Sequence, residues 1–280
     1  MSAAVVVPTI GDAALADSRV TPSRVIRSEI LKMRTLRSTW LTLGVAIASM
    51  AGIGVIICWS SISDLLDGHG DHGERFNPLA DSLAGFELAQ LAIGVLGVLI
   101  IAGEYSSGMI RSTLAAVPKR LPMLWAKVAV FAAVTLVTML VSSLFAFFVS
   151  QHILAGHAAQ GIPYANWHTP TAARTVIGVA LYLTVVGVIG VALGAILRNI
   201  AGAIAVLVGV LLVLPVIASA LPTTWANRIN KFLPSNAGQA LLGGFSDTTQ
   251  MTPWRGFALF CGYAALAVAV AAVLLKRRDA

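Results

Sequence analysis

Six separate stretches of almost uninterrupted apolar residues run through this chain. Each is long enough for a helix to cross the hydrocarbon core of a bilayer, which takes about 20 apolar residues. Apolarity without alternation favours helices over barrel strands, because a helix satisfies its own backbone hydrogen bonds. We therefore predict an all-α polytopic membrane protein with transmembrane helices at about residues 39–61, 85–103, 123–150, 175–197, 200–221 and 256–275.

The composition excludes a soluble protein. Of the 280 residues, 58% are apolar and only 11% are charged, whereas soluble proteins carry about 25% charged residues. So little polar surface cannot cover a core of this size in water. Cys58 and Cys261 lie in separate apolar stretches without the spacing of a zinc site, so we expect both to pack within the helices.

The distribution of lysine and arginine predicts the orientation. With six spans both termini share a side, and that side holds 14 of the 19 Lys and Arg residues while the other holds 5. Cytoplasmic loops of membrane proteins carry such an excess, so we predict a plasma-membrane protein with both termini in the cytoplasm. The net charge of +7 is then explained by orientation and by contact with anionic lipids, and no nucleic-acid partner is expected.

The segment before the first span is expected to hold a tail and a helix. Residues 1–20 lack a signal-peptide pattern and are predicted to be a mobile cytoplasmic tail, with residues 21–278 forming one transmembrane domain. Thr21-Pro22 is typical of a helix start. The apolar residues that follow share one arc beside an arc of arginines: Val25, Ile26, Ile30, Met33 and Leu36. This pattern favours an amphipathic helix lying on the cytoplasmic leaflet, although arginines that only obey the positive-inside rule would produce it too.

Two loops on the opposite side contain candidate features. The first includes DGHGDHGE, where His69 and His72 with nearby carboxylates are a weak candidate for a divalent metal site. The surrounding glycines fit a flexible, solvated loop equally well. The connection 222–255 contains FLPSNAGQALLGGF. It fits either a short helix pair dipping partly into the membrane from outside or a surface helix with a glycine-rich end.

Few ionisable residues fall within the spans. Three roles are compatible with Glu87, which lies near the outer end of the second span: contact with substrate, pairing with a cation, or contact with headgroup water. Its place near the membrane boundary favours the last. Lys127, near the start of the third span, is expected to extend its amine toward the headgroups.

The chain contains none of the common motifs for ATP binding or hydrolysis. It has no GxxxxGK[ST] sequence, so a phosphate-binding loop is missing and any ATPase must be a separate polypeptide. HExxH, GxSxG and paired intramembrane carboxylates are also missing, which argues against a protease, a hydrolase or a proton relay. We expect no catalytic residue and no cofactor bound by this chain.

The segment between the second and third spans reads GEYSSGMIRSTLAAVPKR. Gly108 permits a turn, the residues after it fit a short helix with an apolar face, and Pro118 ends that helix. Such a helix suits a docking surface for a cytoplasmic partner. Together with the six spans and the preceding amphipathic helix, this segment resembles the permease subunits of type-2 ABC exporters. FLPSNAGQALLGG is similar to the partly inserted extracellular helix pair of that family.

The resemblance implies a set of partners and site residues. In that family the segment after the second span is a coupling helix that meets a separate nucleotide-binding subunit. The matching positions here are Glu104, Gly108, Ile110, Arg111 and Leu114. The family also implies a dimer of permeases, identical or different, two cytoplasmic ATPase subunits that hold the ATP, and a substrate path along the permease interface. Candidate lining residues from the first, second and fifth spans are Met50, Ile53, Val95, Val98, Val206 and Val210.

Two other function classes stay open. A signalling or immunity component could keep this fold and conduct nothing. A secondary transporter would show internal repeats, broken helices or buried coupling charges, and these signals are weak. The cargo itself is not specified, although the apolar spans favour an amphiphile.

Overall fold

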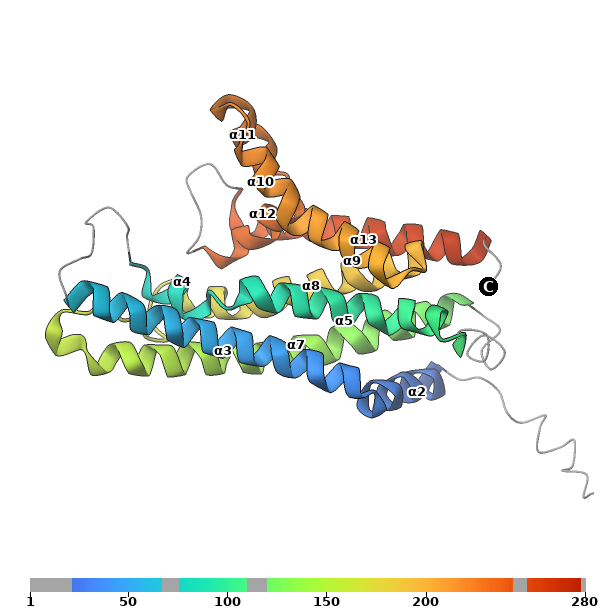
Figure 1. Cartoon of the computed structure of the whole chain (residues 1–280), viewed down its shortest axis with the longest axis horizontal. Helices are drawn as coiled ribbons and strands as arrows, with labels where there is room; N and C mark the ends of the chain where they lie inside the picture. The colour runs from blue at the N-terminus through green and yellow to red at the C-terminus, as the bar shows by residue number, and fades with distance from the viewer. Residues whose placement is uncertain (1–21, 67–75, 110–119, 244–250, 278–280) are drawn as a thin grey trace, which may run out of the picture.

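A computed structural model of the chain describes residues 22–66, 76–109, 120–243 and 251–277 (Figure 1). These residues are mainly helical and contain no strand. Six of their helical segments are long and apolar enough to cross a membrane, which confirms the predicted number. They comprise residues 37–66, 78–106, 121–156, 172–197, 200–219 and 253–277. Five of them run beyond the predicted ranges, because the helices continue into the polar residues at their ends.

Four spans form the centre of the bundle. They are α3 (Arg37–Leu66), α5 (Phe86–Ser106), α7 (Arg120–Gly156) and α8 (Ala172–Leu197). Helix α8 packs on both α5 and α7, and α3 packs on the other side of the same pair. The last span, α13 (Pro253–Arg277), lies along α8. One apolar cluster, which includes Met50, Phe86 and Phe131, joins these helices.

The second span begins with a separate short helix, α4 (Pro78–Leu83). The side chain of Asn77 caps this helix by accepting hydrogen bonds from the backbone amides of Leu79 and Ala80. A break at Gly85 separates α4 from α5. A Cβ atom at Gly85 would lie 2.6 Å from the Cα atom of Met50 in α3, so glycine allows the two chains to approach closely here.

Glycines bring α5 and α8 into backbone contact. A Cβ atom added to Gly97 would overlap the carbonyl oxygen of Gly187, and one added to Gly190 would overlap the carbonyl oxygen of Gly94. A Cβ atom at Gly194 would lie 2.9 Å from the carbonyl oxygen of Val98. Small residues of this kind let membrane helices pack through their backbones.

The fifth span is irregular and only its first half is well packed. It consists of α9 (Ile200–Val208), a π-helical turn (Gly209–Val213) and α10 (Leu214–Ser219). Pro215 lacks a backbone N–H, which accounts for a change of hydrogen-bond pattern at this point. Helix α9 packs on α5 and α8, whereas α10 leaves the bundle (Figure 1) and exposes 69% of Val216.

Two short helices connect the fifth and sixth spans: α11 (Thr223–Asn230) and α12 (Pro234–Gln239). A short helix pair was one of the two predicted forms of this connection. Helix α12 packs tightly, since a Cβ atom at Gly238 would lie 2.6 Å from the ring of Tyr182. Insertion of this pair into the membrane from outside stays a prediction.

Helix α2 (Pro22–Thr35) precedes the first span and packs on α7. Its predicted apolar arc is divided between two environments. Val25 and Met33 are buried, whereas Ile26 and Ile30 are each 40% exposed. One part of the arc therefore faces the protein, and the other part is free to contact lipid.

Helix α2, the end of α5, the start of α7 and the end of α13 all lie at one end of the bundle, on the right in Figure 1. We call this the α2 end. The end of α3, the start of α8 and helix α12 lie toward the other end.

Candidate functional site

A buried cluster of four charged side chains joins three helices at the α2 end. Glu29 and Lys32 come from α2, Glu104 from the last turns of α5, and Lys127 from near the start of α7. Lys127 Nζ lies 2.7 Å from Glu29 Oε2 and 2.8 Å from Glu104 Oε1. Lys32 Nζ lies 2.9 Å from Glu29 Oε1 and 3.0 Å from Glu104 Oε1. We call these four residues the charge tetrad.

The tetrad is electrically balanced, with two carboxylates and two amines. Glu29 is 3% exposed, Glu104 6% and Lys127 2%. Charges this deep are tolerated only when they are paired, because each has lost its hydration. One buried oxygen of Glu104, Oε2, has no hydrogen-bond partner among the described residues. Removing any one member would leave an unpaired charge in an apolar region.

The two α2 members have shifted pKa values. Burial acts to raise the pKa of Glu29, but attraction and hydrogen bonding from Lys127 and Lys32 outweigh it, so the net shift is downward from the ordinary 4.5. Burial acts to lower the pKa of Lys32, but Glu29 and Glu104 outweigh it, so the net shift is upward from the ordinary 10.5. Both residues are therefore held in their charged forms by the tetrad.

The prediction for Lys127 was wrong. Its amine does not extend toward the headgroups but points into the bundle and contacts two carboxylates. The physical reason is that an ion pair in the interior replaces the lost water, an option that exists only because Glu29 and Glu104 reach the same point.

The tetrad lies beside the predicted coupling segment. Glu104 is the second residue of this segment and Lys127 follows it, so one ion pair joins its two ends. Gly108 has a left-handed φ of +71° directly after α5 ends, which confirms the turn predicted there. Ile110, Arg111 and Leu114 lie outside the described residues.

A second contact holds the end of α5. The guanidinium carbon of Arg198 lies 4.9 Å from the centre of the Tyr105 ring, a cation–π geometry. Arg198 adopts a left-handed φ of +53° at the link between α8 and α9. The last turns of α5 are thus connected to α2 and α7 on one side and to the start of the fifth span on the other.

The predicted path residues lie in different environments. Met50 and Val98 are fully buried, and Val98 packs against Ala203 of α9. Ile53, Val95 and Val210 are half-buried, and Val206 is 41% exposed. Their part in a path between two chains stays a prediction.

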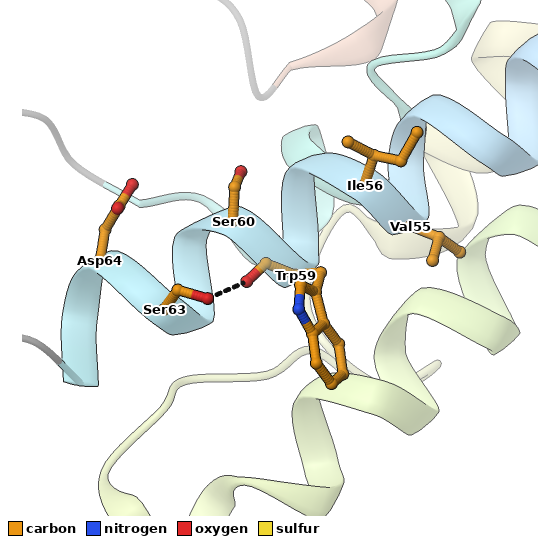
Figure 2. Close-up of a pocket in the computed structure, with 6 residues that line it drawn as sticks. All are labelled: Val55, Ile56, Trp59, Ser60, Ser63 and Asp64. Atoms are coloured by element: carbon orange, nitrogen blue, oxygen red, sulfur yellow. Dashed lines mark hydrogen bonds between the residues drawn. The ribbon is translucent and has the colours of Figure 1, made fainter.

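A groove of about 460 Å³ lies on the surface of α3 (Figure 2). Its lining residues fall on one face of this helix near its end: Val55, Ile56, Trp59, Ser60, Ser63 and Asp64. The groove lies in the second half of α3, whereas α2, which carries Glu29 and Lys32, precedes the first residue of that helix. Asp64 is its one charged lining residue.

The metal prediction falls outside the described residues. His69 and His72, the predicted metal ligands, lie outside the described residues. The described residues contain no group of three metal-ligating side chains.

Glu87 is exposed and its Oε2 accepts a hydrogen bond of 2.7 Å from Gln90 Nε2. Cys58 is buried beside Ser82, and Cys261 is half-buried in α13.

A comparison with known protein families shows the family to which this chain belongs. The family described as ABC-2 family transporter protein matches residues 24–280. The chain belongs to the ABC-2 transporter family. A comparison with curated proteins finds no match. Members of the ABC-2 family are membrane components of transporters, and six membrane-spanning helices in the described residues agree with a type-2 ABC permease subunit.

Sequence reasoning on this ABC-2 protein found one member of the tetrad as a site residue, Glu104. It missed Glu29 as a site residue and misplaced Lys127. A signal was present: Glu29 falls within the apolar arc of α2, and Lys127 falls within an apolar span, so each charge needs a partner of opposite sign.

Proposed function

We propose that this ABC-2 family member is the permease subunit of an ATP-driven exporter, and that the charge tetrad transmits movement between a separate ATPase and the spans. One observation carries the proposal. Lys127 contacts both Glu104 and Glu29, so the two ends of the predicted coupling segment are joined to each other and to α2.

The mechanism follows from this connection. An ATPase that displaces the segment between α5 and α7 would move the last turns of α5 and the first turns of α7 together. The ion pairs would carry α2 with them, since separating buried opposite charges is costly. The contact between Tyr105 and Arg198 would pass the same displacement to the start of the fifth span.

The exposed second half of the fifth span supports a dimer of permeases. Val213, Val216 and Ile217 are 48%, 69% and 58% exposed. A second permease, identical or different, would cover part of this apolar surface, and substrate would pass along that interface. Two ATPase subunits would bind and hydrolyse the ATP, and this chain would bind no cofactor itself.

The proposed orientation places the α2 end in the cytoplasm of the cell, below the plasma membrane. The described arginines of α2, with Lys276 and Arg277, lie at this end, in agreement with the positive-inside rule. Lipid headgroups would contact the arginines and the exposed Ile26 and Ile30 of α2.

The test is co-purification of the ATPase with permease variants under gentle extraction. Ile110→Asp and Leu114→Asp should each reduce the bound ATPase and the substrate-stimulated hydrolysis at least tenfold, because each would bury an unpaired charge in the interface. Arg111→Ala should have a smaller effect. Thr223→Asp, an exposed position at the start of α11, is the control and should behave as wild type.

Two results would contradict the proposal. Full ATPase binding by both Asp variants would remove the docking role of this segment. Failure of any ATPase to co-purify with the wild type, at normal membrane levels, would favour a non-transporting component.

A further inference from the structure

Glu87 is a carboxylate within a membrane-spanning segment, and it has no cationic partner among the described residues. It lies in the first turn of α5, within the span 78–106, and its side chain is exposed. The ion pairs among the described residues use Glu29 and Glu104, and none uses Glu87. An ionisable group within a membrane-spanning segment marks a candidate functional site.

Two amide side chains contact this carboxylate, and a tyrosine from a third helix contacts one of these amides. Gln90 Nε2 donates to Glu87 Oε2 at 2.7 Å, and Gln239 Nε2 of α12 donates to Glu87 Oε1 at 3.4 Å. Tyr182 of α8 donates its hydroxyl proton to Gln90 Oε1 at 2.6 Å. Since Tyr182 occupies the oxygen of the Gln90 amide, the nitrogen of that amide is directed to Glu87.

The inner half of this cluster is rigid. Gln90 is 1% exposed and Tyr182 is fully buried. The Tyr182 ring stacks on Phe260 with ring centres 5.3 Å apart. Gly238 lies against both rings, where a Cβ atom would approach to 2.6 and 2.7 Å. This close approach holds α12 in place and positions Gln239 beside Glu87.

The position of Glu87 at the start of α5 explains why a negative charge is tolerated there, since the helix dipole favours it. The dipole does not explain why two amide side chains and a buried tyrosine, from positions far apart in the sequence, form connected hydrogen bonds at Glu87. The Gln90 and Gln239 amides hold the Glu87 carboxylate in one orientation, and its exposed side stays accessible to a ligand.

The donor set excludes a metal ion as the partner. Both contacts to Glu87 are N–H donors and supply no further oxygen ligand, whereas calcium and magnesium require several oxygen ligands. A single oriented carboxylate suits an organic cation, which needs one opposite charge and an apolar surface. Leu88, the next residue, is 54% exposed and supplies such a surface.

We propose that Glu87 binds the positively charged headgroup of an amphiphilic organic cation, with Gln90, Gln239 and Tyr182 as positioning residues. This inference rests on the proposed transport function, for which it names the substrate class. The apolar part of the ligand lies along the surface around Leu88 while its charge contacts the carboxylate.

The test uses the purified full chain in nanodiscs of phosphatidylcholine, without ATPase. The probes are tetraphenylphosphonium and tetraphenylborate, which have the same shape and opposite charge. Glu87→Gln should weaken the binding of tetraphenylphosphonium about tenfold, as loss of one partly shielded charge pair predicts. It should not weaken the binding of tetraphenylborate. Asp64→Asn removes an exposed carboxylate on α3 and should leave both affinities unchanged.

A second variant makes the test independent of any loss of folding. Glu87→Asp keeps the negative charge at this position and should retain most of the tetraphenylphosphonium affinity that Glu87→Gln loses. The inference is overturned if Glu87→Gln binds tetraphenylphosphonium as tightly as wild type does, if Asp64→Asn weakens it equally, or if Glu87→Asp loses as much affinity as Glu87→Gln does. These measurements need no ATPase, so failure of the cation site and failure of the coupling proposal are separate results.

Discussion

Lys127 Nζ lies 2.8 Å from Glu104 Oε1, and these two residues stand on either side of the segment that joins α5 to α7. The same amine lies 2.7 Å from Glu29 of α2. One lysine therefore connects three helices at the α2 end, and its removal should affect both stability and coupling.

Lys127→Met should lower the free energy of unfolding by about 3 kcal/mol, because it removes the buried amine and leaves two buried carboxylates with the single positive charge of Lys32. Lys276→Met, at an exposed position near the end of α13, is the matched control and should change stability little. Denaturant unfolding in mixed micelles measures both. Equal stability of the two variants would mean that the tetrad is solvated.

Replacing the whole tetrad by methionine should separate its structural role from its role in coupling. Apolar residues of similar volume remove the unpaired charge, so stability should return to within about 1 kcal/mol of wild type. Substrate-stimulated ATP hydrolysis should stay at least tenfold reduced, since the ionic connection between α2, α5 and α7 is gone. Normal hydrolysis by this variant would show that packing alone transmits the movement.

The contribution of Glu29 should depend on pH. Its pKa is lowered from 4.5 in the folded state, so its stabilising effect is present above 4.5 and is lost as the pH falls through the lowered value. The difference in melting temperature between wild type and Glu29→Gln should therefore be large at neutral pH and shrink in acid below pH 4.5. A difference that stays constant down to pH 2 would contradict the ion pairing.

Gly190→Ala should destabilise the protein by about 1–3 kcal/mol, because the added methyl group overlaps the backbone of α5 and forces the helices apart. Gly52→Ala in α3 is the control. A Cβ atom there meets nothing within 4 Å, so alanine should be neutral or stabilising by about 0.5–1 kcal/mol. Thermal unfolding of the two variants side by side gives the comparison.

Single cysteines in a background without Cys58 and Cys261 should report the orientation. Ser63→Cys and Thr223→Cys should react with an impermeant thiol reagent in intact cells, whereas Ser23→Cys should react only after lysis. All three positions are exposed, so protection reflects the membrane. Labelling of Ser23→Cys from outside would reverse the topology and the coupling proposal with it.

The sequence was sufficient for the number and type of the spans, because continuous apolarity over the width of a bilayer permits few alternatives. It did not predict the break at Gly85 or the π-helical turn at Gly209–Val213. These features depend on what the neighbouring helices present, such as the backbone of Met50 against Gly85, and no local pattern encodes such a neighbour.

The sequence alone did not predict the polar contacts either, because their partners come from other helices. Lys127 and Glu29 are 98 positions apart, and Tyr182 and Gln90 are 92 positions apart. The sequence singled out Glu87 as a charge within a span and Glu104 through its resemblance to the family's coupling segment, but their partners became visible only when the packing of α2, α8 and α12 was known.

The backbone contact between α5 and α8 has a practical consequence for watching this protein work. Helices that touch through glycine carbonyls cannot slide past one another without steric overlap, so the second and fourth spans should keep a fixed separation in every state. Probes attached to these two helices then provide an internal length standard. Because the distance between these two helices stays constant, a change in the distance from either of them to a probe on α10 reports displacement of the fifth span.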